Sequence, residues 1–164
     1  MTTWELRTRL RLPRPRPEIF AFFADAGNLE TLTPPWLRFR ILTPWPIEMR
    51  AGALIEYRLR VHGVPVRWKT EITTWEPPDR FVDEQRRGPY RLWIHEHTFE
   101  DAPGSGTFIR DRVRYRVPFG RLANWLVVER DARTIFRYRS EALLRLFGGN
   151  EEDVEPVVVE EVPG

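Results

Sequence analysis

The sequence contains no cysteine, and Lys69 is its only lysine among 164 residues. Without cysteine the chain cannot form a disulfide bond, a thiolate nucleophile or a cysteine-based zinc site. No apolar run is long enough to span a bilayer, and no apolar segment of the signal-peptide kind follows Met1. We therefore expect a cytoplasmic protein that does not insert stably into a membrane.

Positive charge comes almost entirely from arginine, and it is unevenly distributed. The chain has 26 basic and 24 acidic residues, and six of the acids lie in residues 150–164, which contain no base. The arginines alternate along predicted strands and form no compact basic stripe, so we predict no nucleic-acid partner. We predict one domain over residues 1–149 and an acidic, disordered tail over residues 150–164.

A polar and apolar alternation with a period of two predicts seven strands. Two short helices are expected after the first strand, where Pro17 can open one and Asn28 can cap the other. His62-Gly63 is suited to a two-residue hairpin turn, since glycine supplies a positive φ. The predicted strands are Thr3–Leu12, Leu37–Thr43, Ala53–Val61, Val64–Trp75, Arg80–Arg87, Arg91–Phe99 and Thr107–Arg116.

The period changes from two to helical spacing after Pro118. Apolar residues recur every three or four positions from Leu122 to Phe147, which predicts one long amphipathic helix ended by Gly148-Gly149. Arg137 and Arg139 interrupt its apolar stripe. We expect them on the solvated face of the helix, and the alternative is that one of them reaches a ligand carboxylate or an inward aspartate.

The strand from Arg91 to Phe99 carries the most informative residues. Its alternation places Trp93, His95 and His97 on one face, with successive side chains about 6.6 to 6.8 Å apart. In the other strands the arginine-rich face should meet water, so the opposite face should point inward. Buried polar groups on that face need partners or bordering water, because burying them unpaired is destabilising.

We predict that these inward residues border a ligand cavity beneath the long helix. Aromatic side chains would stack on the ligand, and polar side chains would orient its polar end. The alternative is that these aromatic side chains are ordinary core residues, which would give the same sequence pattern. The predicted ligand-binding residues are Tyr57, Trp68, Thr70, Asp83, Gln85, Trp93, His95, His97, Asp111 and Tyr115.

The order of elements and several short stretches resemble the SRPBCC superfamily, also called START-like or polyketide cyclase/dehydrase-like, and most closely its bacterial ligand-binding SRPBCC domains. The resemblance covers about residues 3–147 and implies an α+β helix-grip fold, with a seven-stranded antiparallel sheet wrapped around a long C-terminal helix. The stretches that carry it are Pro17–Phe23, Asn28–Glu30, Thr33–Phe39, Arg80–Asp83 and Gly88–Phe99.

The resemblance and the inward residues together support three functions. The first is binding of a small hydrophobic or amphipathic ligand by a monomer or homodimer. The second is an enzyme of the cyclase or dehydratase type, which the resemblance implies and which would use a His–Asp acid–base pair. The third is a non-catalytic interaction module with a filled core, whose partner meets the arginine-rich face or the acidic tail.

Two further hypotheses concern the chemistry of the histidines. A histidine beside a carboxylate can act as a general acid or base near neutral pH, which makes His95 and Asp111 candidate catalytic residues. A purely structural His–Asp hydrogen bond explains the same residues. Strand geometry also allows a metal site on His95, His97 and Asp111, but His97 fits equally well at the sheet margin, and we predict no metal or other cofactor.

Overall fold

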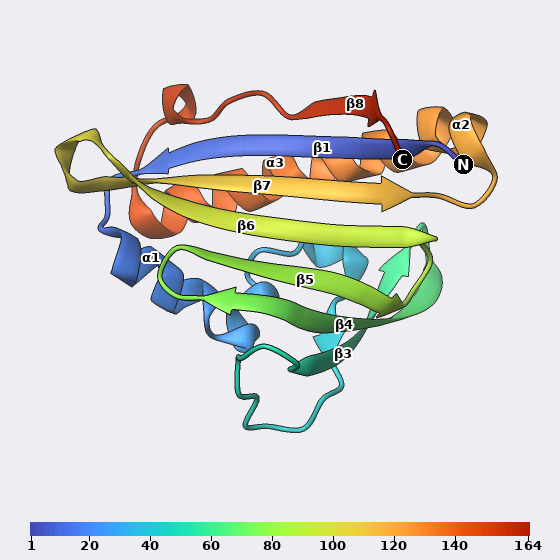
Figure 1. Cartoon of the computed structure of the whole chain (residues 1–164), viewed down its shortest axis with the longest axis horizontal. Helices are drawn as coiled ribbons and strands as arrows, with labels where there is room; N and C mark the ends of the chain where they lie inside the picture. The colour runs from blue at the N-terminus through green and yellow to red at the C-terminus, as the bar shows by residue number, and fades with distance from the viewer.

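The computed structural model describes all 164 residues and has the predicted α+β architecture, an open antiparallel sheet with one long C-terminal helix (Figure 1). The sheet has eight strands in the order β2-β3-β4-β5-β6-β7-β1-β8, so hairpins build most of it. The strands are β1 Thr3–Leu12, β2 Arg40–Ile41, β3 Leu54–Val61, β4 Val64–Glu76, β5 Arg80–Arg87, β6 Leu92–Ala102, β7 Gly106–Arg116 and β8 Val158–Val162. The helical segments are α1 Arg16–Phe23, η1 Ala26–Leu29, η2 Pro35–Leu37, η3 Pro103–Ser105, α2 Gly120–Ala123, η4 Asn124–Val128, α3 Glu129–Phe147 and η5 Glu151–Asp153.

Alternation along the strands separates a wet face from a buried face, as the sequence predicts. Leu6 of β1 lies opposite Val113 of β7, and both side chains are buried. One position further on, Arg7 lies opposite Arg112 on the outer face. The two positively charged guanidinium groups repel each other, and the Glu5 carboxylate offsets this repulsion. It accepts a 2.8 Å hydrogen bond from Arg112 and lies 3.5 Å from Arg7.

The hairpin between β3 and β4 has the predicted two-residue turn. Val61 pairs with Val64, and His62 and Gly63 between them have φ values of 49° and 79°. Two consecutive positive φ values match the right-handed twist of the flanking strands, and glycine adopts such a φ without steric strain. The turn places His62 at the tip of the β3–β4 hairpin.

The segment between α1 and β3 is less regular than predicted. The second short helix is the 3₁₀ turn η1, and the side chain that caps it is Asp25, which accepts a 2.9 Å hydrogen bond from Gly27 N. The predicted strand Leu37–Thr43 is reduced to β2. Two prolines initiate η2 directly before it, and Arg38 has a left-handed φ of 46°, so the chain becomes extended only at Arg40.

The predicted long helix runs from Gly120 to Phe147, but it is not uniform. Its first residues form α2, a single π-helical turn follows as η4, and only α3 is regular. Asn124, buried in the π turn, accepts a 3.0 Å hydrogen bond from the hydroxyl of Tyr115. No helix in the chain combines the length and the apolar character needed to cross a membrane.

Helix α3 packs against one half of the sheet. Ala132 and Phe136 contact a buried cluster on β1 and β7 that includes Leu6 and Val113. The C-terminal half of α3 joins a second cluster through Leu143, together with α1 and the far ends of β1, β6 and β7. Because the helix lies over β1 and β7, the strands β3 and β4 at the other side of the sheet are left uncovered by it (Figure 1).

The C-terminal tail corrects the sequence-based prediction of disorder and of a seven-stranded sheet. Residues 158–162 form β8, which pairs antiparallel with β1 and becomes the eighth strand. Four of the six acids form ion pairs with arginines, so the tail is not simply a solvated run of charge. Glu160 accepts a 2.6 Å hydrogen bond from Arg7, and Glu155 accepts one of 2.9 Å from Arg9. The tail thereby covers the edge of β1, which would otherwise offer an unpaired strand to another chain.

We predict that removing residues 150–164 lowers the unfolding temperature by roughly 4–8 °C, because Val154, Val157 and Val159 pack against the core clusters and about 2 kcal/mol is lost with them. The exposed edge of β1 should also promote self-association. Differential scanning calorimetry and size-exclusion chromatography measure both effects. As a control, Glu160→Gln in the full chain should change stability by less than about 1 kcal/mol. A truncated chain as stable as the full one would show that the tail is not part of the fold.

Candidate functional site

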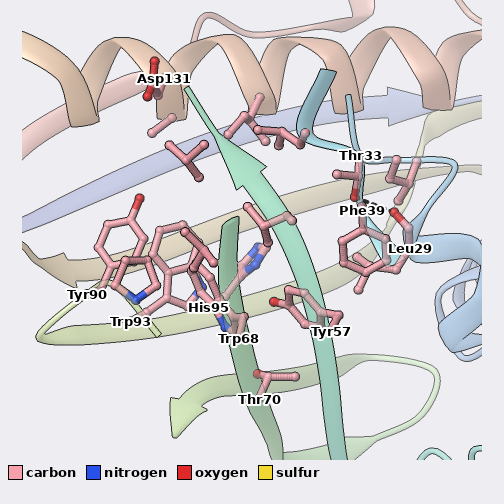
Figure 2. A pocket seen from close by; sticks show the side chains of 18 of the residues that line it. Leu29, Thr33, Phe39, Tyr57, Trp68, Thr70, Tyr90, Trp93, His95 and Asp131 are labelled. Carbon is pink, nitrogen blue, oxygen red and sulfur yellow. Dashed lines mark hydrogen bonds between the residues drawn. The ribbon is translucent and has the colours of Figure 1, made fainter. Parts of the chain in front are cut away.

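A cavity of about 820 Å³ lies between α3 and the uncovered part of the sheet (Figure 2). Its walls are largely apolar, and they come from β3, β4, β6, α3 and the segment after α1. The volume is within the range of roughly 300–1,000 Å³ that is usual for small-molecule sites. The cavity follows from the position of α3, since this helix packs on β1 and β7 and leaves much of β3 and β4 uncovered.

Aromatic rings line the sheet side of the cavity. Tyr57 stacks on Trp68 with 6.0 Å between ring centroids, and Trp68 meets Trp93 edge to face at 5.4 Å. Tyr90 completes the group at 4.7 Å from Trp93. Figure 2 shows these four side chains together at one side of the cavity. Tyr90 follows a turn and not a strand position, so the alternation did not indicate it.

Seven of the ten predicted ligand-binding residues line this cavity. They are Tyr57, Trp68, Thr70, Asp83, Trp93, His95 and His97. The other three, Gln85, Asp111 and Tyr115, do not line it. The inward orientation of the histidine-bearing face therefore agrees with the structure, and three individual assignments need correction.

Each of the three corrections has a local cause. Gln85 Nε2 donates a 2.8 Å hydrogen bond to the carbonyl of Tyr90, so its amide secures the β5–β6 turn. Tyr115 is enclosed between Trp4 and the π turn at Asn124. Asp111 does point inward, but it lies on the neighbouring strand β7, where it contacts both histidine rings and Arg139 of α3 and does not reach the cavity.

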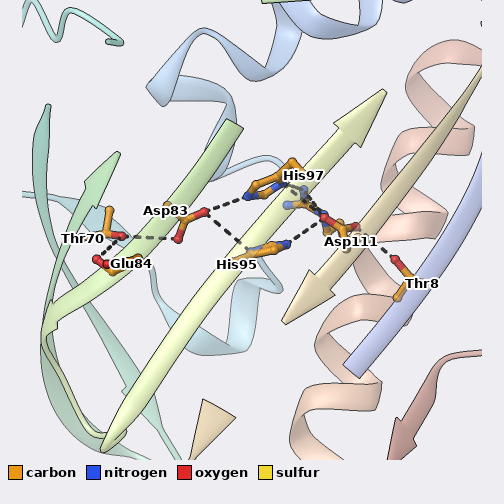
Figure 3. A network of polar contacts seen from close by, with 8 residues as sticks. Thr8, Thr70, Asp83, Glu84, His95, His97 and Asp111 are labelled. Atoms are coloured by element: carbon orange, nitrogen blue, oxygen red, sulfur yellow. Dashed lines mark hydrogen bonds and ion pairs between the residues drawn. The ribbon is translucent and has the colours of Figure 1, made fainter. Parts of the chain in front are cut away.

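The polar residues form one connected network at the floor of the cavity (Figure 3). His95 Nε2 lies 2.8 Å from Asp111 Oδ1, and His97 Nε2 lies 2.7 Å from Asp83 Oδ2. The two imidazole rings stack with 3.7 Å between their centroids. At one end the hydroxyl of Thr70 donates to Asp83 Oδ1 over 3.3 Å, and at the other Thr8 donates to Asp111 Oδ2 over 3.1 Å.

Arg139 is the functional residue that sequence reasoning placed wrongly. We predicted it on the solvated face of the helix, and Arg137 is indeed exposed, but Arg139 is only 7% exposed. Its guanidinium NH2 lies 3.3 Å from Asp111 Oδ1 and 3.2 Å from His97 Nδ1, and the group sits over the ring of Phe23. The inward Asp111 was the available signal, because a buried carboxylate requires a cationic partner.

Burial and the positive charge of Arg139 have opposite effects on the pKa values of the carboxyl groups in the network. Burial by itself would raise the pKa of Asp111, but the charge of Arg139 and the hydrogen bonds from both histidines hold that pKa well below its usual range. The pKa of Asp83 is lowered in the same way, by His97 and His95 against the effect of burial. Burial lowers the pKa of His95, so this ring is neutral at neutral pH.

A polar contact closes one side of the cavity. His62, at the tip of the β3–β4 hairpin, lies 2.7 Å from Asp131 on α3, and both residues line the cavity. Nearby, Val64 is 62% exposed and Phe119, before α2, is 93% exposed. The hairpin and the start of the helical region therefore meet at an apolar rim. The sequence pattern indicates only a turn position for His62, because its contact with Asp131 of α3 is tertiary.

Comparison with known proteins agrees with this geometry. Residues 12–143 match the model of the family described as polyketide cyclase / dehydrase and lipid transport. The chain belongs to this family. Its fold, with a hydrophobic cavity under the C-terminal helix, is one that suits ligand binding. No curated protein matches the sequence.

Solved structures with a similar fold come from bacteria and plants. Protein Ms6760 from Mycobacterium smegmatis is 18% identical with a TM-score of 0.65, over 87% of this chain and 89% of that one. A START superfamily protein from the same organism is 12% identical with a TM-score of 0.65, over 88% and 97%. Ginseng major latex-like protein 151 from Panax ginseng is 9% identical with a TM-score of 0.66, over 90% and 99%. At these identities the likeness establishes the fold alone.

We predict that Asp111→Asn destabilises the protein by about 3–5 kcal/mol, because it leaves the buried Arg139 guanidinium without a charged partner. Urea unfolding followed by tryptophan fluorescence measures this loss. Asp79→Asn, which breaks an exposed ion pair with Arg16, is the matched control and should change stability by less than about 1 kcal/mol. Equal effects of the two substitutions would mean that Asp111 does not hold the network together.

Proposed function

We propose that the protein binds a small, largely apolar molecule in the cavity beneath α3, with the polar end of that molecule against the His–Asp network. The observation that carries the proposal is a single cavity whose walls are aromatic and aliphatic and whose floor holds buried, hydrogen-bonded charges. Apolar walls supply affinity, and a few placed polar groups fix the orientation of a ligand.

Two hydrogen-bond donors in residues that line the cavity have no partner, and they indicate the chemistry of the ligand's polar end. Trp68 Nε1 and Arg139 Nε are buried and have no hydrogen-bond partner, and both residues line the cavity. Buried donors are almost always paired in proteins. A ligand with carbonyl, hydroxyl or carboxylate oxygens would satisfy them once either side chain turns toward the cavity, because neither nitrogen is accessible from it in this structure. The proposed ligand is therefore amphipathic, with acceptor oxygens on an otherwise apolar skeleton.

A second candidate function is acid–base catalysis of the cyclase or dehydratase type. The specific observation in its favour is that His95 is neutral, lines the cavity and is backed by the Asp111 carboxylate 2.8 Å away. A neutral imidazole held in this way can remove a proton from a carbon acidified by a neighbouring carbonyl. The third function considered, an interaction module with a filled core, is opposed by the cavity.

We predict that Trp93→Ala weakens binding of an apolar fluorescent probe, 1-anilinonaphthalene-8-sulfonate, by roughly tenfold, since about 1–2 kcal/mol of apolar contact is lost. Titration of the purified protein measures the change, and native mass spectrometry of the same sample detects any co-purifying molecule. Trp45→Ala is the matched control, because Trp45 is 58% exposed and lies outside the cavity. Equal affinity of both variants and the unaltered chain would remove the cavity as the binding site.

The same samples separate binding from catalysis. If the protein is a cyclase or dehydratase, a poly-β-keto thioester should be converted to a ring-closed or dehydrated product. His95→Gln should then abolish conversion and leave binding of the probe within about twofold, because the substitution removes the base and keeps the shape. Binding without any conversion supports a binding protein.

A further inference from the structure

We propose that Asp83, His95 and His97 form a binding site for a divalent transition-metal ion at the floor of the cavity. Asp83 Oδ2 lies 2.7 Å from His97 Nε2 and 3.8 Å from His95 Nδ1, and one ligand atom from each of the three residues lies within 4.8 Å of the other two. Ligand atoms around a tetrahedral zinc ion are separated by roughly 3.4 Å, so the two distances lie on either side of this value. Small side-chain rotations would complete the site.

The carboxylate on the opposite side of the rings prepares both histidines for this role. Asp111 Oδ1 lies 2.8 Å from His95 Nε2 and 3.3 Å from His97 Nδ1. When both nitrogens donate to Asp111, each ring presents its other nitrogen, a lone pair, toward Asp83. Metal-binding histidines characteristically donate their second N–H to a carboxylate, which fixes the ring and strengthens the ligand. One aspartate does this here for two rings (Figure 3).

Charge at the floor of the cavity also favours a cation. Two imidazole lone pairs directed at the Asp83 carboxylate repel it unless a proton or a metal ion lies between them. With neutral rings, the two carboxylates exceed the single guanidinium of Arg139 by one negative charge. A divalent ion makes the cluster positive by one. If the proposed function holds, an anionic oxygen of the ligand would neutralise that charge and bind the metal directly.

Three protein ligands on one side leave coordination positions open toward the cavity, as in catalytic and not structural zinc sites. Two imidazoles and a carboxylate suit Zn²⁺, Co²⁺ or Fe²⁺. A competing arrangement uses Arg139, whose NH2 group lies 3.2 Å from His97 Nδ1. If it donates to that nitrogen, the proton of His97 moves to Nε2 and occupies the place of the metal. The two arrangements exclude each other.

Metal titration of the full-length protein tests the proposal. After removal of bound metal with a chelator, Co²⁺ should bind with one equivalent per chain and give the visible absorption of a low-symmetry nitrogen and oxygen site, and Zn²⁺ should displace it. Asp83→Asn and His95→Gln should each weaken binding at least 100-fold. Asp111→Asn keeps all three metal ligands but removes the carboxylate that orients both rings, and in the folded variant it should weaken binding about 10- to 100-fold. His62→Gln, which alters a histidine outside the cluster, should have no effect.

Two outcomes would overturn the proposal. The first is no stoichiometric Co²⁺ binding by the folded chain. The second is binding that survives both Asp83→Asn and His95→Gln. Circular dichroism confirms that each variant is folded, and His97→Gln replaces any variant that is not. A chain that fails to bind Co²⁺ and still binds the apolar probe would refute the metal site and leave the proposed function intact.

Discussion

The Asp111 carboxylate is the interaction on which the rest of the site depends. It holds Arg139 from the long helix and His95 and His97 from the neighbouring strand, and Thr8 donates to its second oxygen. The buried Asp111 carboxylate and the buried Arg139 guanidinium are stable beneath the cavity because each meets the opposite charge. The network fixes the helix to the sheet at one point and presents the ring nitrogens and Asp83 to the cavity.

The cavity has a geometric origin. The long helix packs on β1 and β7 through residues such as Ala132 and Phe136, and the sheet extends beyond it to β3 and β4. Apolar side chains on those two strands that α3 does not reach, such as Leu59 and Val66, consequently line the cavity. An interior of this kind sacrifices packing contacts that a filled core would have. The aromatic rings replace some of these packing contacts by packing on one another, as Tyr57, Trp68 and Trp93 do.

Periodicity predicted most of the fold and the orientation of the site, because a strand allows only two faces. The placement of Trp93, His95 and His97 inward followed from that rule alone. Contacts that depend on register or on distant elements were not predictable. Asp83 faces the histidines because β5 and β6 pair in one particular register, Arg139 reaches them from an element forty residues away, and the acidic tail pairs with arginines at the other end of the chain.

The most direct test of this arrangement is the nitrogen-15 spectrum of the histidine side chains of metal-free protein at neutral pH. Burial and the 2.8 Å contact with Asp111 predict that His95 is neutral, carries its proton on Nε2 and exchanges that proton slowly with solvent. A charged His95 ring, or one that interconverts between tautomers as an exposed imidazole does, would contradict a buried network beneath the cavity.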